Sequence, residues 1–244
     1  MRVETEQRAR FLVYSSKGQE GKVAFDQILF AVGRCPRLDN LGLESLNLRR
    51  NGNGTIVVNK FLQTSVPSIY ACGDVLGPFR FTHMASYQAS YAVRNALFPL
   101  VKRAVDYSLV PWATFTDPEV ATVGLNERTA QGKGLPYEIT CLPVSEVDRA
   151  ICEGETEGFI RVLTTPRKGR IIGATVVAAH GGELLMEYML AIKQKMTLAD
   201  ILKTIHVYPT MMDANRHLAA SWQEAHIPRI VSRIMRSVHY LGRA

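Results

Sequence analysis

The chain has 244 residues, of which 47% are hydrophobic and 21% charged, which is ordinary for a globular protein with a substantial core. Its formal net charge of +7 does not gather into a basic patch interleaved with aromatic residues, so we expect no nucleic-acid partner. No apolar run approaches the roughly 20 residues that span a bilayer, and the charged residues 1–6 do not resemble a signal peptide. We therefore expect a cytoplasmic protein without a membrane span.

The first predicted elements are hairpins. Apolar and polar residues alternate over 10–14 and resume at 22–25, with a turn at Lys17-Gly18 between them. Residues 28–32 form an apolar run that predicts a strand. Residues 40–62 predict a second hairpin, whose turn is the Asn-Gly-Asn-Gly of residues 51–54 and whose strand is 55–58.

The apolar run 68–72 ends in Gly73-Asp74 and predicts a buried strand. In open α/β sheets, ligands bind at the carboxyl ends of strands. Gly73 allows close backbone approach to a ligand, and the Asp74 carboxylate can accept hydrogen bonds from sugar or ribityl hydroxyls. Taken alone, this junction is more often an ordinary turn than a ligand site.

A helix is predicted from Thr82 to about Phe98, with small residues on one face: Ala85, Ala89, Ala92 and Ala96. A linker follows at 106–108. Beyond it we predict strands at 113–115, 121–124, 137–142, 158–163 and 171–178, with a helix after the second strand.

The next predicted helix, 182–193, is apolar on two sides. One stripe is Leu185, Met189 and Ile192, and it is widened by Leu184, Met186 and Leu190. Such a helix needs a second packing partner. Beyond Glu224, arginines alternate with apolar residues and predict a basic amphipathic helix packed on its own protein.

The four cysteines are not spaced as a redox pair or as a zinc site: Cys35, Cys72, Cys141 and Cys152. We therefore predict no metal site and reduced, structural thiols. Cys72 adjoins the Gly73-Asp74 junction and could be reactive, but a buried strand cysteine is the favoured interpretation.

Four ordered motifs point to a family. Residues 26–36, 68–74, 115–124 and 208–213 resemble the carboxyl-terminal half of the FAD-dependent pyridine nucleotide-disulfide oxidoreductases. This is the family of dihydrolipoamide dehydrogenase, glutathione reductase and mercuric reductase. The resemblance runs from about residue 23 to about residue 220.

The resemblance implies an α+β chain in four parts. Residues 1–25 would be strands from the end of an NAD(P)H-binding domain, and 26–107 the carboxyl-terminal part of an FAD-binding α/β domain. Residues 108–225 would be a dimerisation domain with an antiparallel sheet and flanking helices, which pairs with its copy in a homodimer. Residues 226–244 would be the basic tail.

The resemblance also places residues at FAD: Gly33, Gly73, Asp74, Thr82, His83 and Met84. The last three would face the flavin ring chiefly through backbone N–H groups at the amino end of their helix. We favour His83 as an ordinary helix residue over a role in proton transfer.

The motif at 208–213 departs from the family pattern. The usual motif has a His that acts as acid and base toward a redox dithiol, and a Glu that orients it across the dimer; here Tyr208 and Asp213 occupy these positions. A phenol has an ordinary pKa of about 10 and is a poor base at neutral pH, which puts the usual disulfide reduction in doubt. His206 is a weak candidate substitute. The Tyr208-Pro209 bond is a candidate for the cis form.

Residues 149–159 resemble the mercuric reductase branch, but the chain ends without that branch's vicinal cysteine pair, so mercury specificity stays open. The sequence has no Gly-x-Gly-x-x-Gly and no Cys-x-x-x-x-Cys.

We interpret the chain as a fragment of an enzyme that passes electrons from NAD(P)H through FAD to a disulfide, metal ion or related small-molecule acceptor. The fragment itself is expected to dimerise but not to catalyse. The alternative is a non-catalytic dimerisation module, which would dimerise without binding flavin.

Overall fold

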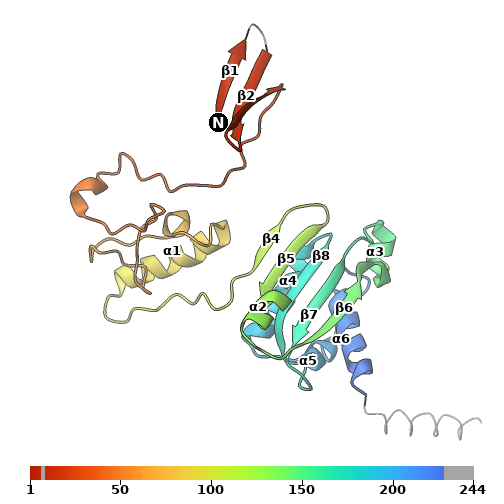
Figure 1. Ribbon diagram of the computed structural model, residues 1–244. Coiled ribbons are helices and arrows are strands. Elements are labelled where there is room, and N and C mark those ends of the chain that lie inside the picture. Colours follow the sequence, from red (N-terminus) through yellow and green to blue (C-terminus); the bar gives the residue numbers. More distant parts are fainter. Residues whose placement is uncertain (7–8, 228–244) are drawn as a thin grey trace, which may run out of the picture. The chain divides into compact units, whose positions relative to one another are not determined.

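The computed structural model describes residues 1–6 and 9–227 (Figure 1). It divides into two compact units, Met1–Val105 (unit 1) and Asp106–Ala244 (unit 2). Nearly all of the predicted basic tail lies outside the described residues. Within the part of the chain that the structure describes, no helix is long and apolar enough to cross a bilayer.

Unit 1 begins with a three-stranded antiparallel sheet in the order β1-β2-β3. The strands are β1 (Arg2–Glu6), β2 (Ala9–Ser16) and β3 (Gln19–Phe25). Lys17 and Gly18 connect β2 to β3 with φ angles of 52° and 79°. Two consecutive positive φ angles suit the right-handed twist of a tight hairpin, so the first predicted hairpin is confirmed. The sequence reading missed β1.

The strands predicted between residues 26 and 81 are wrong. Residues 26–81, all of which the structure describes, contain only isolated bridges, Arg50 to Ile56 and Gln63 to Tyr70, and two 3-10 helices, η1 (Leu43–Leu46) and η2 (Gly73–Leu76). Residues 28–32 do not pair, and Leu29, Phe30 and Val32 are 88%, 70% and 83% exposed. An apolar run becomes a strand only where another strand takes its backbone hydrogen bonds. The predicted turn at 51–54 does form, because Gly54 N–H donates to the Asn51 carbonyl (2.9 Å).

The helix predicted from Thr82 is confirmed as α1 (Thr82–Leu97). Its fully buried residues are Met84, Gln88, Ala92 and Asn95, so only Ala92 of the predicted alanine face is fully buried, and Ala85 and Ala89 are half-buried. Ala96 is exposed. The face differs because α1 packs against a small cluster around Leu62 and against loop backbone, which polar side chains can reach.

Unit 2 contains a five-stranded antiparallel sheet in the order β4-β5-β8-β7-β6 (Figure 1). The strands are β4 (Trp112–Thr114), β5 (Glu119–Gly124), β6 (Glu138–Pro143), β7 (Phe159–Thr164) and β8 (Ile171–Ala178). All five were predicted, and β8 has the predicted bounds. The α+β class with an antiparallel sheet is therefore confirmed.

Helices surround this sheet: α2 (Glu127–Gly132), α3 (Asp148–Glu153) after the 3-10 helix η3 (Val144–Glu146), α4 (Gly181–Lys193), α5 (Leu198–Leu202) and α6 (Asp213–Ala225). Helix α4 packs on β5 and β8, and α6 packs on β6 and β7. The sequence reading found α2 and α4 but missed α3, α5 and α6.

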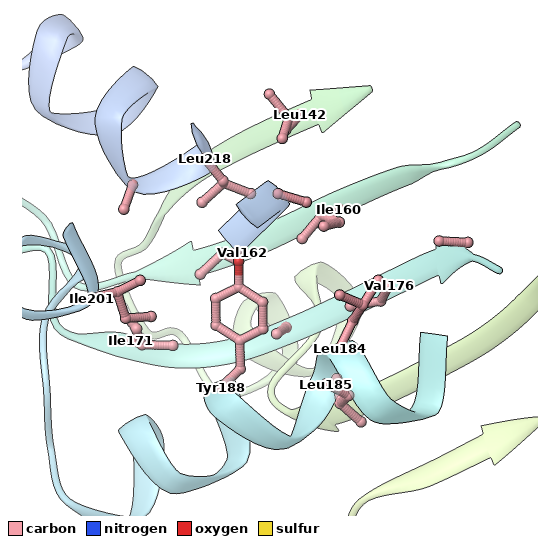
Figure 2. Packing of buried hydrophobic residues seen from close by; sticks show 14 of the residues in the cluster. Leu142, Ile160, Val162, Ile171, Val176, Leu184, Leu185, Tyr188, Ile201 and Leu218 are labelled. Carbon is pink, nitrogen blue, oxygen red and sulfur yellow. The ribbon is translucent and has the colours of Figure 1, made fainter. Parts of the chain in front are cut away.

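The core of unit 2 lies between sheet and helices. In Figure 2, Tyr188 extends from α4 toward Val162 of β7, and Leu218 of α6 lies near Leu142 and Ile160. All of these side chains are buried. Burial of apolar surface at about 25 cal/mol per Å² makes this cluster the main source of stability for unit 2.

Helix α4 carries apolar side chains on two sides, as predicted, but the residues that are buried differ from the predicted stripe. Leu184, Leu185, Tyr188 and Ala191 face the core, whereas Met189 and Ile192 are only partly buried. Two large apolar side chains remain exposed, Met186 and Leu190.

Candidate functional site

The Gly73-Asp74 junction begins η2 rather than ending a strand. Gly73 is buried with a φ of 79°, and its N–H donates to Gln88 Oε1 (2.6 Å). A Cβ added to Gly73 would lie 3.2 Å from the Ala85 Cβ. Positive φ and close packing therefore both favour glycine here, and the small Ala85 lets the turn approach α1.

The Asp74 carboxylate is partly exposed beside the turn. Its Oδ2 lies 3.7 Å from Arg34 Nη1, which is a loose, solvent-exposed ion pair. A cavity of about 290 Å³ opens here, lined by Arg34, Cys35, Pro36, Arg37, Asp74, Val75 and Arg80. Gly33, next to Arg34, is exposed with a φ of 95°. The carboxylate thus keeps acceptor capacity toward a ligand.

The amino end of α1 follows directly. Its N-cap residue, Phe81, makes no side-chain capping hydrogen bond. Thr82 and His83 are exposed, and the His83 ring stacks on Phe81 with 5.1 Å between ring centroids. The Met84 side chain is buried, so only the backbone of this residue can face a ligand at this surface.

Tyr208 lies in the segment between α5 and α6, and the Tyr208-Pro209 bond is cis, as the sequence suggested. The side chain is 65% exposed, and its hydroxyl donates to Asp148 Oδ2 at the start of α3 (2.9 Å). The Asp148 carboxylate raises the pKa of Tyr208, first through this hydrogen bond and then through charge repulsion. Tyr208 is therefore a neutral phenol at physiological pH and a poor base.

Asp213 is buried at the first position of α6. The Tyr208 hydroxyl donates to Asp148 and not to Asp213. Asp213 Oδ1 accepts from Arg216 Nε (2.7 Å), and Asp213 Oδ2 lies 3.2 Å from His217 Nε2. The hydrogen bond that Arg216 donates to Asp213 raises the pKa of Arg216. A carboxylate in the first turn of a helix also interacts favourably with the helix dipole.

His206 is bound to the body of unit 2. Its Nε2 lies 3.0 Å from Glu187 Oε1 on α4, and its Nδ1 lies 2.9 Å from the Thr204 carbonyl oxygen. Glu187 Oε2 also accepts from Asn215 Nδ2 (2.8 Å). The His206 side chain is 4% exposed, which supports a role in holding the segment before Tyr208 rather than a role as substitute base.

Asp148 and Glu187 were missed by the sequence reading. Asp148 is 60 positions from Tyr208, and Glu187 is 19 positions from His206. No local pattern marks either residue, because their contacts are created by the packing of α3 and α4.

The prediction of structural cysteines is wrong for most of the four. All are free, but Cys35, Cys141 and Cys152 are exposed, and Cys72 is half-buried in the residues before η2 rather than in a strand. Among residues 1–6 and 9–227, no group of three or more His, Cys, Asp or Glu side chains could hold a metal ion.

Two family models match the chain. Residues 2–89 match the pyridine nucleotide-disulphide oxidoreductase domain, and residues 110–219 match the dimerisation domain of the same enzymes. Together the two matches cover most of the sequence, and each lies within one unit.

Curated relatives agree with these matches. A dihydrolipoyl dehydrogenase from Chlamydia muridarum is 36% identical over 206 residues, which are 84% of this chain and 44% of the relative. A mercuric reductase from Staphylococcus aureus is 34% identical over 224 residues, which are 91% of this chain and 41% of the relative. The chain thus spans about half the length of the curated relatives it matches.

Solved structures give the same result. The HOCl-induced flavoprotein disulfide reductase RclA from Escherichia coli matches with a TM-score of 0.79 at 26% identity, covering 90% of this chain and 49% of that chain. Members of the matching family bind FAD and take electrons from NAD(P)H. By its motifs, its fold and these relatives, the chain belongs to the pyridine nucleotide-disulfide oxidoreductase family.

Proposed function

We propose that the chain supplies the carboxyl-terminal, flavin-facing and dimer-forming part of an oxidoreductase that passes electrons from NAD(P)H through FAD to a disulfide, metal ion or related acceptor. Residues 1–25 would end the NAD(P)H-binding domain, 26–107 would complete the FAD-binding domain, and 108–225 would form the homodimer. The observation that carries this proposal is the junction of Gly73, Asp74 and the amino end of α1.

The residues of unit 1 fit one part of FAD. The Asp74 carboxylate can accept hydrogen bonds from ribityl hydroxyls, and the first turn of α1 with Thr82 and His83 presents backbone N–H groups toward a ring carbonyl or nitrogen. The pyrophosphate has no glycine-rich loop in this sequence, so the chain supplies only the carboxyl-terminal share of the site. When bound, FAD would supply the electron transfer.

Exposed apolar side chains support dimerisation through unit 2. Met186 and Leu190 on α4 and Ile205 and Val207 beside Tyr208 are exposed, and Ile205 is 96% exposed. Large exposed apolar groups are typical of surfaces that bind another protein. In the homodimer, Tyr208 would face the active site of the partner, with Asp213 buried behind it.

The alternative is a non-catalytic dimerisation module. The exposed segment 28–32 favours it, because this apolar run directly precedes Gly33 and is not paired with another strand. The two functions differ in flavin binding and not in dimerisation.

The test measures the visible absorption spectrum and the sedimentation mass of the purified chain with and without added FAD. We expect a dimer with a flavin band, and loss of that band in Asp74→Asn but not in the control Asp39→Asn, an exposed acid of the same unit. A colourless dimer would support the alternative module. A monomer would contradict the proposed dimerisation.

A further inference from the structure

Tyr208 has a fixed partner within its own unit. Tyr208 is mostly exposed, yet its hydroxyl donates to Oδ2 of Asp148, the first residue of α3, at 2.9 Å. An exposed phenol without such a bond would sample several rotamers, because rotamer freedom lowers the free energy of an unrestrained side chain. A hydrogen bond to an ionised carboxylate is stronger than one between neutral groups, so it restricts that freedom.

Asp213 does not perform this task. Its carboxylate is occupied by Arg216 and lies near His217, both on its own helix, and only 6% of its side chain is exposed. Asp213 acts on Tyr208 only through a minor charge repulsion, as would an ionised thiolate at Cys152, one turn beyond Asp148 on α3. Of the groups that act on the phenol, Asp148 is the one that forms a hydrogen bond with it.

We infer that Asp148 is a positioning residue for Tyr208: it accepts the hydroxyl hydrogen of the neutral phenol and so holds the side chain in one orientation at the surface of unit 2. The inference rests on the proposed function for its catalytic meaning. In this arrangement Tyr208 supplies neither a base nor a free donor, because its one hydroxyl hydrogen is donated to Asp148. The lone pairs of the phenol oxygen remain, so the fixed hydroxyl can accept a hydrogen bond from a group of the substrate or partner.

The direction of the Tyr208 pKa agrees with this assignment. The Asp148 carboxylate stabilises the neutral phenol by accepting its hydrogen bond and repels the phenolate, and both effects raise the pKa of Tyr208. The neutral form and its hydrogen bond are therefore present at and below the ordinary phenol pKa of about 10. They are lost as the pH rises through the raised value.

The test is an NMR titration of the whole chain labelled with ¹³Cζ-tyrosine, in which the Tyr208 resonance is the one that Tyr208→Phe removes. Asp148→Asn removes the charge and keeps an acceptor oxygen, and Asp148→Ala removes both. We expect the pKa of Tyr208 to fall in Asp148→Asn and at least as far in Asp148→Ala, and Asp148→Glu to recover part of the rise. The control Glu146→Gln removes an equal charge two residues away and should leave the titration unchanged.

An unchanged Tyr208 titration in both Asp148→Asn and Asp148→Ala would overturn the inference, and so would an equal shift in Glu146→Gln. Because Asp148 is exposed, its variants should keep the tryptophan fluorescence of the folded chain. The titration needs neither flavin nor activity. A colourless chain with the expected shift would therefore refute the proposed flavin binding while supporting the role of Asp148.

Discussion

Asn95 in unit 1 and Leu218 in unit 2 are both fully buried, but they stabilise their units by different interactions. Asn95 Nδ2 donates to the carbonyl oxygens of Phe61 and Arg103, and its Oδ1 accepts from the Arg103 N–H. Leu218 packs in a continuous apolar cluster under the sheet. Unit 1 thus depends on polar side chains that bind loop backbone, and unit 2 depends on apolar packing.

The difference follows from strand pairing. Every strand of the unit 2 sheet has a hydrogen-bonded neighbour, so its apolar side chains lie on a common face that helices can cover. The apolar run 28–32 in unit 1 has no such neighbour, and its side chains remain exposed. Unit 1 can therefore bury only a small apolar cluster around Leu62, Ala92 and Val105.

The largest expected effect is in the apolar core. Leu218→Ala should lower the free energy of unfolding of unit 2 by about 2–5 kcal/mol, because it leaves a cavity among closely packed side chains. Both tryptophans of the sequence, Trp112 and Trp222, lie in unit 2, so denaturant unfolding followed by tryptophan fluorescence measures this unit. Leu135→Ala, at an exposed leucine of the same unit, should cost less than about 1 kcal/mol. Equal costs for the two variants would show that unit 2 does not depend on its core.

A smaller effect is expected from Asn95, the buried polar side chain of α1 in unit 1. Asn95→Ala leaves the Arg103 N–H and two carbonyl groups without their buried partner, at a cost of about 1–3 kcal/mol. Hydrogen exchange of the α1 amides should become correspondingly faster. Ser86→Ala, at an exposed position of the same helix, should leave that exchange nearly unchanged. If Asn95→Ala exchanged like wild type, apolar packing alone would account for unit 1.

The smallest effect is expected from a polar contact in unit 2. Asp200 Oδ2 accepts from the Thr197 N–H (2.9 Å) and hydroxyl (2.7 Å) in the capping box of α5, and these bonds lower the pKa of Asp200. The folded state thus favours the carboxylate, so this stabilisation is present above the ordinary Asp pKa of about 4 and is lost as the pH falls through the lowered value.

Asp200→Asn should therefore cost about 0.5–1 kcal/mol near neutral pH, measured by the same fluorescence unfolding, and the difference from wild type should shrink toward acid pH. Glu157→Gln, at an exposed acid of unit 2, provides the comparison. A difference for Asp200→Asn that stayed constant between neutral and acid pH would contradict the role of the ionised carboxylate.

Local patterns determined much of this protein by themselves. The alternation of apolar residues predicted β2, β3 and the whole unit 2 sheet, and helical spacing predicted α1 and α4. The roles of the motif residues Gly73, Asp74 and Tyr208, singled out from the sequence, stay predictions. These signals succeed because strand and helix periods, turn glycines and short motifs are properties of neighbouring residues.

Only the tertiary structure decided the rest. It showed that residues 28–32 and 68–72 are not strands, that α6 begins at Asp213, and that Tyr208 and His206 bind Asp148 and Glu187. A strand requires a partner, and the contact between Tyr208 and Asp148, 60 positions apart, requires α3 to lie beside the segment that precedes α6. Strand pairing and long-range side-chain contacts cannot be predicted from the residues adjacent to the site, because both depend on which distant segments fold against it.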